Sequence, residues 1–180
     1  MSSLTIAKKY AKAFWEIGLK DGNHETLGQD LNKMADLLGE SKELREALRN
    51  PAFPKPNRQA IGRKIGERLG LAAKTIKLIE LLIHRKRIDL FPEITKAYRD
   101  LCDEAAERIR VTLNTPVELP PGLVQEIKSL IESLTGKEAI LSLENDPSLI
   151  GGALMKIGNV VYDASLKGQM TKLRDNLYKE

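Results

Sequence analysis

Apolar side chains recur every three or four residues from Leu4 to about Leu101, which is the spacing of one face of an α-helix. Six successive stripes follow this spacing. They contain Ile6, Tyr10, Phe14 and Ile17; Leu27, Leu31, Met34 and Leu38; Leu44 and Leu48; Ile61, Ile65 and Leu69; Ile76, Ile79 and Leu82 or Ile83; and Ile94, Tyr98, Leu101, Cys102 and Ala105. Because glycines and prolines separate the stripes, we predict six helices with short loops in a compact bundle.

One connector in this part of the chain is rich in proline. Residues 51–56 read Pro-Ala-Phe-Pro-Lys-Pro, and we expect this hexapeptide to be a rigid, non-helical link. Asn57 is then the predicted N-cap of the fourth helix.

The pattern changes near Arg108. Residues 108–115 alternate apolar and polar side chains, which is typical of a strand. The remaining elements are a helix with Val124, Ile127, Ile131 and Leu134, a strand at 139–143, a hairpin of 153–157 with 160–163 around Gly158-Asn159, and a final helix with Leu166, Met170, Leu173 and Leu177. The predicted fold is therefore mainly α, with a six-helix bundle over residues 1–105 and a small α+β domain over residues 106–180.

Composition supports a globular chain built on aliphatic side chains. Of its 180 residues, 42% are hydrophobic and 30% are charged, whereas only 4% are aromatic. The single cysteine, Cys102, excludes an internal disulfide, and its helical position predicts a packed core thiol. We also find no secretory signal and no apolar run near the roughly 20 residues of a membrane span, so we expect a soluble protein in a reducing compartment.

Catalytic chemistry has little support in the sequence. His24 and His84 are far apart, and neither stands beside a nucleophile motif. Gly151-Gly152 lacks the Lys-Ser/Thr of a phosphate loop and precedes a strand, so it reads as a turn. We expect no catalytic residues, no cofactor and no metal site.

A basic stretch offers the main alternative. Within residues 49–77, Glu67 is the only acidic side chain. The basic ones are Arg49, Lys55, Arg58, Arg63, Lys64, Arg68, Lys74 and Lys77. Such a stretch favours a helical RNA-binding module if the charges face several phosphates. After Phe53, however, the stretch has no aromatic residue for base stacking, and charge runs are usually solvated.

The first helix has a second possible role. Ala7, Ala11 and Ala13 lie among its larger apolar residues, and small side chains let another helix approach closely. The same face also suits an internal core, so the sequence leaves both interpretations open.

Several segments resemble a known family along the whole chain. They are Ile6-Ala7-Lys8-Lys9-Tyr10-Ala11-Lys12-Ala13-Phe14, Asn50-Pro51, the segment 81–87 with Ile94 and Tyr98, the segment 143–152, and 156–158 with 161–166. These segments are similar to the delta subunits of bacterial F-type ATP synthase and to the mitochondrial oligomycin-sensitivity-conferring protein. The signature positions are Asp146, Pro147, Gly151, Gly152, Asp163 and Ser165. Departures are small: Lys86 and Ala164 stand where the family often has glycine.

The resemblance implies a non-catalytic stator connector of the rotary ATP synthase, located peripherally on the cytoplasmic face of the cell (inner) membrane. The helical domain would bind alpha subunits of the catalytic head, and the C-terminal domain would bind the peripheral-stalk b subunits, around residues 160–177. A helix from an alpha subunit is expected between the first and fifth helices. Its predicted contacts are Tyr10, Ala11, Phe14 and Ile17 on one wall, and Ile76, Ile79 and Ile83 on the other. Ala11→Glu is expected to abolish this binding in a chain that still folds.

Overall fold

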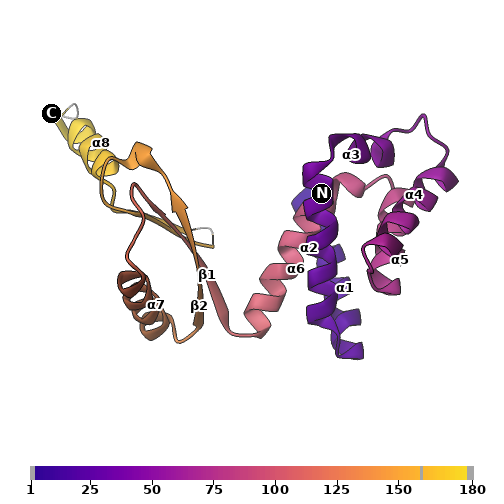
Figure 1. Ribbon diagram of the computed structural model, residues 1–180, viewed down its shortest axis with the longest axis horizontal. Helices are drawn as coiled ribbons and strands as arrows, with labels where there is room; N and C mark the ends of the chain where they lie inside the picture. Colours follow the sequence, from indigo (N-terminus) through magenta and orange to yellow (C-terminus); the bar gives the residue numbers. More distant parts are fainter. Residues whose placement is uncertain (1–2, 159, 178–180) are drawn as a thin grey trace. The chain divides into compact units, whose positions relative to one another are not determined.

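The computed structural model describes the backbone of residues 3–158 and 160–177, and its contacts divide the chain into two compact units, Met1–Cys102 and Asp103–Glu180. The expected apolar positions Leu173 and Leu177 lie outside the described side chains. A mainly helical fold with a small four-stranded sheet is confirmed for the described residues (Figure 1). The sequence placed the division after Ala105, whereas the contacts place it within the last helix before the sheet.

The described residues of the first unit form helices and the loops between them, without a strand. Its elements are α1 (Ser3–Asp21), α2 (His24–Glu40), α3 (Lys42–Arg49), α4 (Lys55–Arg68), α5 (Ala73–His84), the short 3₁₀ helix η1 (Ile88–Leu90) and α6 (Phe91–Ala105), which runs past the unit boundary. The predicted stripes supply most of the core, in which Leu27, Leu31 and Ile94 have no exposed surface. Cys102 is half-buried and packs against this core.

The proline-rich connector is shorter than the sequence suggested. Helix α4 begins at Lys55 and contains Pro56 in its first turn, with Pro54 as N-cap. The prediction that residues 51–56 are non-helical was therefore wrong for Lys55 and Pro56. The prediction of Asn57 as the N-cap was also wrong. First-turn N–H groups have no helical acceptor, so a proline there removes no hydrogen bond.

In this unit, side chains of one helix form hydrogen bonds with backbone groups at the end of another helix. The buried carboxylate of Asp30 on α2 accepts hydrogen bonds from the Ala72 amide at 2.7 Å and the Thr75 hydroxyl at 3.1 Å, at the start of α5. Ala72 has no capping side chain of its own, so α2 supplies the N-cap of α5. The buried Arg58 of α4 reaches the Leu48 and Arg49 carbonyls at the end of α3. These bonds hold the helices in register.

The second unit is built on a mixed sheet. Its elements are β1 (Arg108–Thr115), α7 (Pro121–Thr135), β2 (Glu138–Asn145), the 3₁₀ helix η2 (Pro147–Leu149), β3 (Leu154–Ile157), β4 (Val160–Asp163) and α8 (Leu166–Leu177). The strand order is β2-β1-β3-β4, with β1 parallel to β2 and the other pairs antiparallel. The predicted hairpin is confirmed, since Ile157 pairs with Val160.

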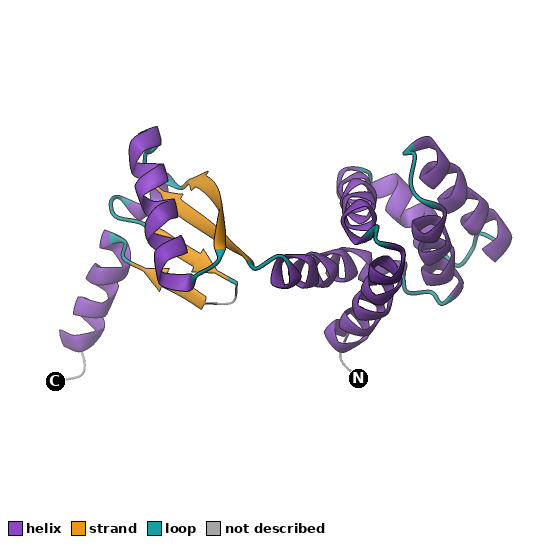
Figure 2. Cartoon of the chain, turned by 90° about the horizontal axis from the view of Figure 1, so that it is seen from below, coloured by secondary structure: helices purple, strands orange, loops and turns teal. Residues whose placement is uncertain are grey.

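Helix α7 is the crossover that makes β1 and β2 parallel, and it packs against the sheet beside β2 (Figures 1 and 2). Ile131 from α7, Val111 from β1 and Ala139 from β2 form the buried core. Strand β4 has exposed side chains at all its positions. The described part of the chain contains no helix that is both long enough and apolar enough to cross a lipid bilayer.

Candidate partner-binding groove

One concave surface of the first unit lies between α1 and α5. Phe14 and Ile17 of α1 face Leu78 and Leu81 of α5 across a cavity of ≈ 300 Å³. Lys74 and Lys77, also from α5, complete the lining. Ile17 and Leu81 each expose 42% of their surface, so both sides of the cavity present apolar surface to solvent. The cavity is therefore an apolar groove with cations on its α5 side.

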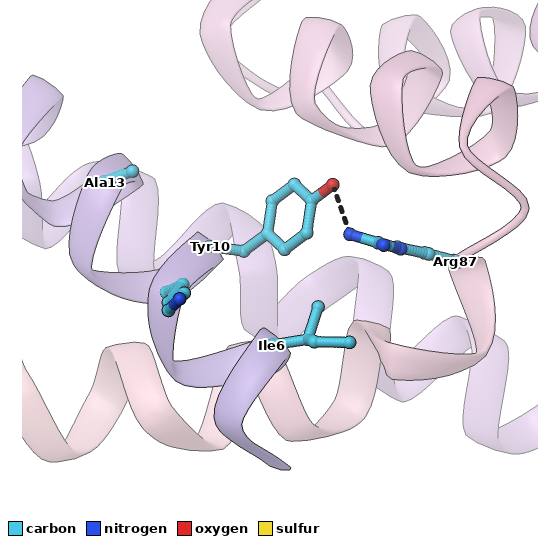
Figure 3. A pocket seen from close by; sticks show the side chains of 5 residues that line it. Ile6, Tyr10, Ala13 and Arg87 are labelled. Atoms are coloured by element: carbon cyan, nitrogen blue, oxygen red, sulfur yellow. Dashed lines mark hydrogen bonds between the residues drawn. The ribbon is translucent and has the colours of Figure 1, made fainter. Parts of the chain in front are cut away.

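A second cavity of ≈ 290 Å³ lies towards the N-terminal end of α1. It is lined by Ile6, Lys9, Tyr10, Ala13 and Arg87. The Arg87 guanidinium donates a hydrogen bond to the Tyr10 hydroxyl at 3.3 Å, and its central carbon lies 5.8 Å from the centre of the Tyr10 ring (Figure 3). This contact ties the loop after α5 to α1.

The predicted α1 wall divides between the groove and the core. Phe14 and Ile17 line the first cavity and Tyr10 lines the second. Ala11 instead has no exposed surface and belongs to the core. A glutamate at this position would be buried without a partner, so Ala11→Glu is now expected to unfold the unit instead of leaving it folded.

The predicted α5 wall lies on a different face of the helix. Ile79 and Ile83 have no exposed surface, and they pack against α4, where Gly62 leaves room for them. A Cβ added at Gly62 would lie 2.8 Å from Ile83 Cδ1, and one at Gly66 would lie 2.7 Å from Ile76 Cγ1. The structure therefore places Ile76, Ile79 and Ile83 against α4 and not in the groove.

The residues that do line the α5 side were missed for a physical reason. Helix α5 reads Ala-Lys-Thr-Ile-Lys-Leu-Ile-Glu-Leu-Leu-Ile-His and is apolar on several faces, so periodicity alone cannot choose which face meets α1. A signal was present in the spacing. The lining residues Lys74, Lys77, Leu78 and Leu81 follow the i, i+3, i+4, i+7 positions of one helical face.

The signature residues of the second unit form a hydrogen-bonded lock at the start of α8. The Asp163 carboxylate accepts from the Ser165 amide at 2.9 Å and from its hydroxyl at 2.6 Å. The Ser165 hydroxyl in turn accepts from the Gly168 amide at 3.0 Å, as an N-cap does. Gly152 has a φ of +77°, and a Cβ there would collide with the Ala164 carbonyl oxygen. These residues therefore have a structural role in the isolated chain.

The loop before the lock is also fixed by a carboxylate. Asp146 accepts from the Ser148 amide at 3.0 Å, at the start of η2, which contains Pro147. The hydrogen bonds from Ser148 hold the pKa of the Asp146 carboxyl below its usual range. Gly151 follows η2, and its carbonyl accepts from the Leu166 amide at 3.0 Å, which joins this loop to α8.

Four of the eight basic side chains of residues 49–77 make contacts inside their own unit. Arg58 is buried against the end of α3. Three further members form ion pairs, which are Arg49–Asp89, Arg63–Glu80 and Lys74–Asp21. This arrangement gives no support to an RNA-binding surface. Among the residues that the structure describes, no group of three or more potential metal ligands comes together.

The comparisons with known proteins identify the class to which this arrangement belongs. Residues 6–177 match the family model described as ATP synthase delta (OSCP) subunit. The chain is 37% identical over 177 residues to ATP synthase subunit delta of Syntrophobacter fumaroxidans, covering 98% of this chain and 97% of the relative. It is 36% identical over 179 residues to the protein of the same name from Geobacter sp. strain M21, covering 99% of both. The chain therefore belongs to the ATP synthase delta (OSCP) subunit family.

A solved structure shows the same fold at lower identity. A chain of the Toxoplasma gondii mitochondrial ATP synthase hexamer aligns with a TM-score of 0.75 and 19% sequence identity. The alignment covers 96% of this chain and 97% of that chain. Both the helical unit and the sheet unit thus have counterparts in one solved protein.

Proposed function

We propose that this chain is the non-catalytic stator connector of an F-type ATP synthase. Residues 1–105 bind the N-terminal helices of alpha subunits in the catalytic head, and residues 106–180 bind the b subunits of the peripheral stalk. The complex holds the chain at the cytoplasmic face of the cell (inner) membrane. Its task is mechanical, because the rotor would otherwise turn the catalytic head during proton-driven ATP synthesis.

The groove between α1 and α5 is the observation that carries this proposal. Ile17 and Leu81 leave apolar surface exposed on opposite sides of a cavity, which Phe14 and Leu78 also line. An amphipathic helix is the natural occupant of such a groove, because its apolar stripe covers the exposed side chains while its polar face stays in water. The exposed apolar surface then becomes the core of the interface.

The mechanical role sets a lower limit on affinity. A connector that dissociated during each rotation could not resist the torque of the rotor. Its complexes must therefore persist through many catalytic turnovers. Dissociation constants in the nanomolar range or below, about −12 kcal/mol, meet this requirement. Affinity of this size comes from a few well-packed apolar anchors surrounded by polar contacts. Ile17 and Leu81 would contact those anchors directly.

The second unit offers a separate apolar surface for the stalk. Val160, Val161 and Tyr162 of β4 each expose more than half of their surface. Leu166 and Met170 of α8 expose 48% and 65%. These side chains follow one another along residues 160–177, and surface of this kind on an ordered element often marks a protein interface. We assign the stalk-binding surface to this segment.

Titration calorimetry of the full chain tests the head-binding part. The ligand is a synthetic peptide that copies the N-terminus of the host's alpha chain, and we expect tight one-to-one binding with a negative heat-capacity change. Ile17→Glu and Leu81→Glu place a charge in the groove at exposed positions, so the chain should fold and binding should weaken by at least about 100-fold. Leu134→Glu on α7, where 77% of the leucine surface is exposed, is the matched control. Normal binding by both groove variants would contradict the proposal.

The same preparation tests the stalk-binding part. A peptide that copies the C-terminal end of the stalk's b protein should bind the unaltered chain, and Met170→Glu on α8 should weaken that complex without changing binding of the alpha peptide. Absence of both complexes, together with salt-sensitive RNA retention, would overturn the connector in favour of a nucleic-acid module.

A further inference from the structure

We propose that the groove selects a helix with two carboxylates about two turns apart, one for each end of the α1–α5 seam. This inference rests on the proposed function and specifies the chemistry of its partner helix. One carboxylate meets Lys74 and Lys77, and the other meets Arg87. The apolar side chains between the two carboxylates cover Phe14, Ile17 and Leu81.

The charges of the two cavities support this assignment. One cavity has Lys74 and Lys77 in its lining, and the other has Lys9 and Arg87. None of the described lining residues of either cavity is acidic. Each cavity thus combines an apolar floor with a cationic edge, and this combination favours a partner with carboxylates beside apolar side chains.

Contacts within the chain already show what these cations attract. Lys74 forms an ion pair with Asp21, which stands at the last position of α1. At the other end, the Arg87 guanidinium donates to a neutral phenol, the Tyr10 hydroxyl. A phenol does not neutralise the guanidinium charge, so a carboxylate from a partner adds a charge-assisted bond there. Asp21 is a competitor for the partner's carboxylate at the Lys74 end.

The spacing of the two cavities determines how far apart the two carboxylates must stand on the partner helix. Tyr10 faces Arg87, and Ile17 faces the lysine end of the seam. Seven residues separate Tyr10 from Ile17, which is about 10.5 Å along a helix at 1.5 Å per residue. A partner helix that runs beside α1 spans this distance with carboxylates at i and i+7. An extended strand would span it with i and i+3.

The apolar floor argues against a nucleic acid as the occupant. Phosphates would satisfy the lysines and Arg87, but they would leave Ile17 and Leu81 exposed to water. Of the two aromatic residues that line the described seam, Phe14 exposes only 4% of its surface, and the Arg87 guanidinium lies over the ring of Tyr10. Stacking platforms for bases are therefore not available in this groove.

The experiment is a calorimetric comparison of charge variants in the full chain. Lys77→Gln and Arg87→Gln should each weaken binding of the alpha peptide by about threefold to fivefold, because edge pairs of this kind contribute modestly. Lys64→Gln, at an exposed lysine of α4, is the matched control and should leave affinity unchanged. Asp21→Asn should tighten binding, because it releases Lys74 for the partner. If Asp21 and Lys74 had only a structural role, Asp21→Asn would not increase the affinity for the peptide.

Changes in the peptide supply the second half of the test. Replacing its acidic residues by the corresponding amides should weaken binding about tenfold and reduce its salt dependence. Shifting its carboxylates by two positions moves them about 200° around the helix and should have the same effect. Tight binding that is indifferent to all of these changes overturns this inference and leaves the proposed connector intact. Failure of the unaltered chain to bind the native peptide overturns the proposed function, and this inference with it.

Discussion

The helical unit buries many large side chains such as Leu31, Phe91 and Ile94, whereas the sheet unit buries fewer apolar side chains among its described residues, namely Val111, Leu113, Ile131, Ala139 and Leu149. Apolar burial contributes roughly 25 cal/mol per Å², so the helical unit has much the larger hydrophobic stabilisation. The sheet unit relies more on strand pairing and on the polar lock at the start of α8.

This contrast has a consequence for how each unit meets a partner. The helical unit can leave the apolar surface of one groove exposed to solvent and still fold, because its core does not depend on that surface. The sheet unit leaves apolar side chains of β4 and α8 exposed while its own core is small. We therefore expect a partner to supply a larger share of the stability of the sheet unit, because the gain from binding is set by affinity and concentration and adds there to a smaller intrinsic stability.

The largest expected effect comes from breaking the lock. Gly152→Ala puts a Cβ against the Ala164 carbonyl oxygen at a φ of +77°, and it should destabilise the sheet unit by about 3 kcal/mol. Hydrogen exchange of the β1 amides measures this loss. Fluorescence of Trp15, the only tryptophan in the chain, reports the helical unit and should stay unchanged.

A matched glycine separates the collision from the backbone conformation. Gly136 has a φ of +67°, and a Cβ there would meet nothing within 4 Å. Gly136→Ala should therefore cost only the conformational term, about 1 kcal/mol. Equal losses in the two variants would show that the contact with Ala164 does not matter.

The next effect concerns the cap that α2 supplies to α5. Asp30→Ala leaves the Ala72 amide and the buried Thr75 hydroxyl without their acceptor, which should destabilise the helical unit by about 2 kcal/mol. Chemical denaturation followed by Trp15 fluorescence measures it. Peptide binding should also weaken, because α5 forms one wall of the groove. Asp30→Asn keeps an acceptor oxygen and should be milder.

A smaller effect is expected when the close packing of α4 on α5 is changed. Gly62→Ala adds a Cβ 2.8 Å from Ile83 Cδ1, and should cost about 1 kcal/mol because that side-chain end can move. Ile83→Val removes the obstructing methyl group, so the double variant should recover part of the loss. Gly39→Ala, in α2 with no neighbour within 4 Å, should instead stabilise slightly. Thermal unfolding of the four variants shows whether each change stabilises or destabilises the helical unit.

The smallest expected effect is a pH dependence in the sheet unit. Asp146 has a lowered pKa in the folded chain because Ser148 donates to its carboxylate. The folded state therefore binds this proton less tightly than the unfolded chain. Its contribution is fully present above the ordinary aspartate pKa of about 3.9 and disappears as pH falls through the lower folded value. Asp146→Asn should remove this component from an acid titration followed by hydrogen exchange.

Much of the local structure could be predicted because it depends on neighbours in the chain. The helical stripes, the pairing of Ile157 with Val160 and the change of pattern at Arg108 all appear where the sequence indicated, whereas Asn159 of the predicted hairpin lies outside the described residues. Pro56 was misjudged, because a proline is tolerated in a first turn whose N–H groups have no helical acceptor. The parallel pairing of β1 with β2 was not predicted, since alternation reveals a strand and not its partner.

The groove shows the same limit. Its location between the first and fifth helices came from the resemblance, and the structure places the isoleucines predicted for its α5 wall against α4. Ile79 and Ile83 are drawn to α4 because Gly62 leaves space there, and only the packed structure shows that space. Leu78 and Leu81 are left to face α1.

The main helices and strands, their order, the change from helix to sheet and the family could all be inferred from the sequence, because period, turn chemistry and motif are properties of neighbouring residues. The tertiary structure decided which side of α5 lines the groove, which carboxylate caps that helix, and which cations stand at the two ends of the seam. These features join residues distant in the chain, such as Asp30 with Ala72 and Tyr10 with Arg87, and they exist only once the helices have packed.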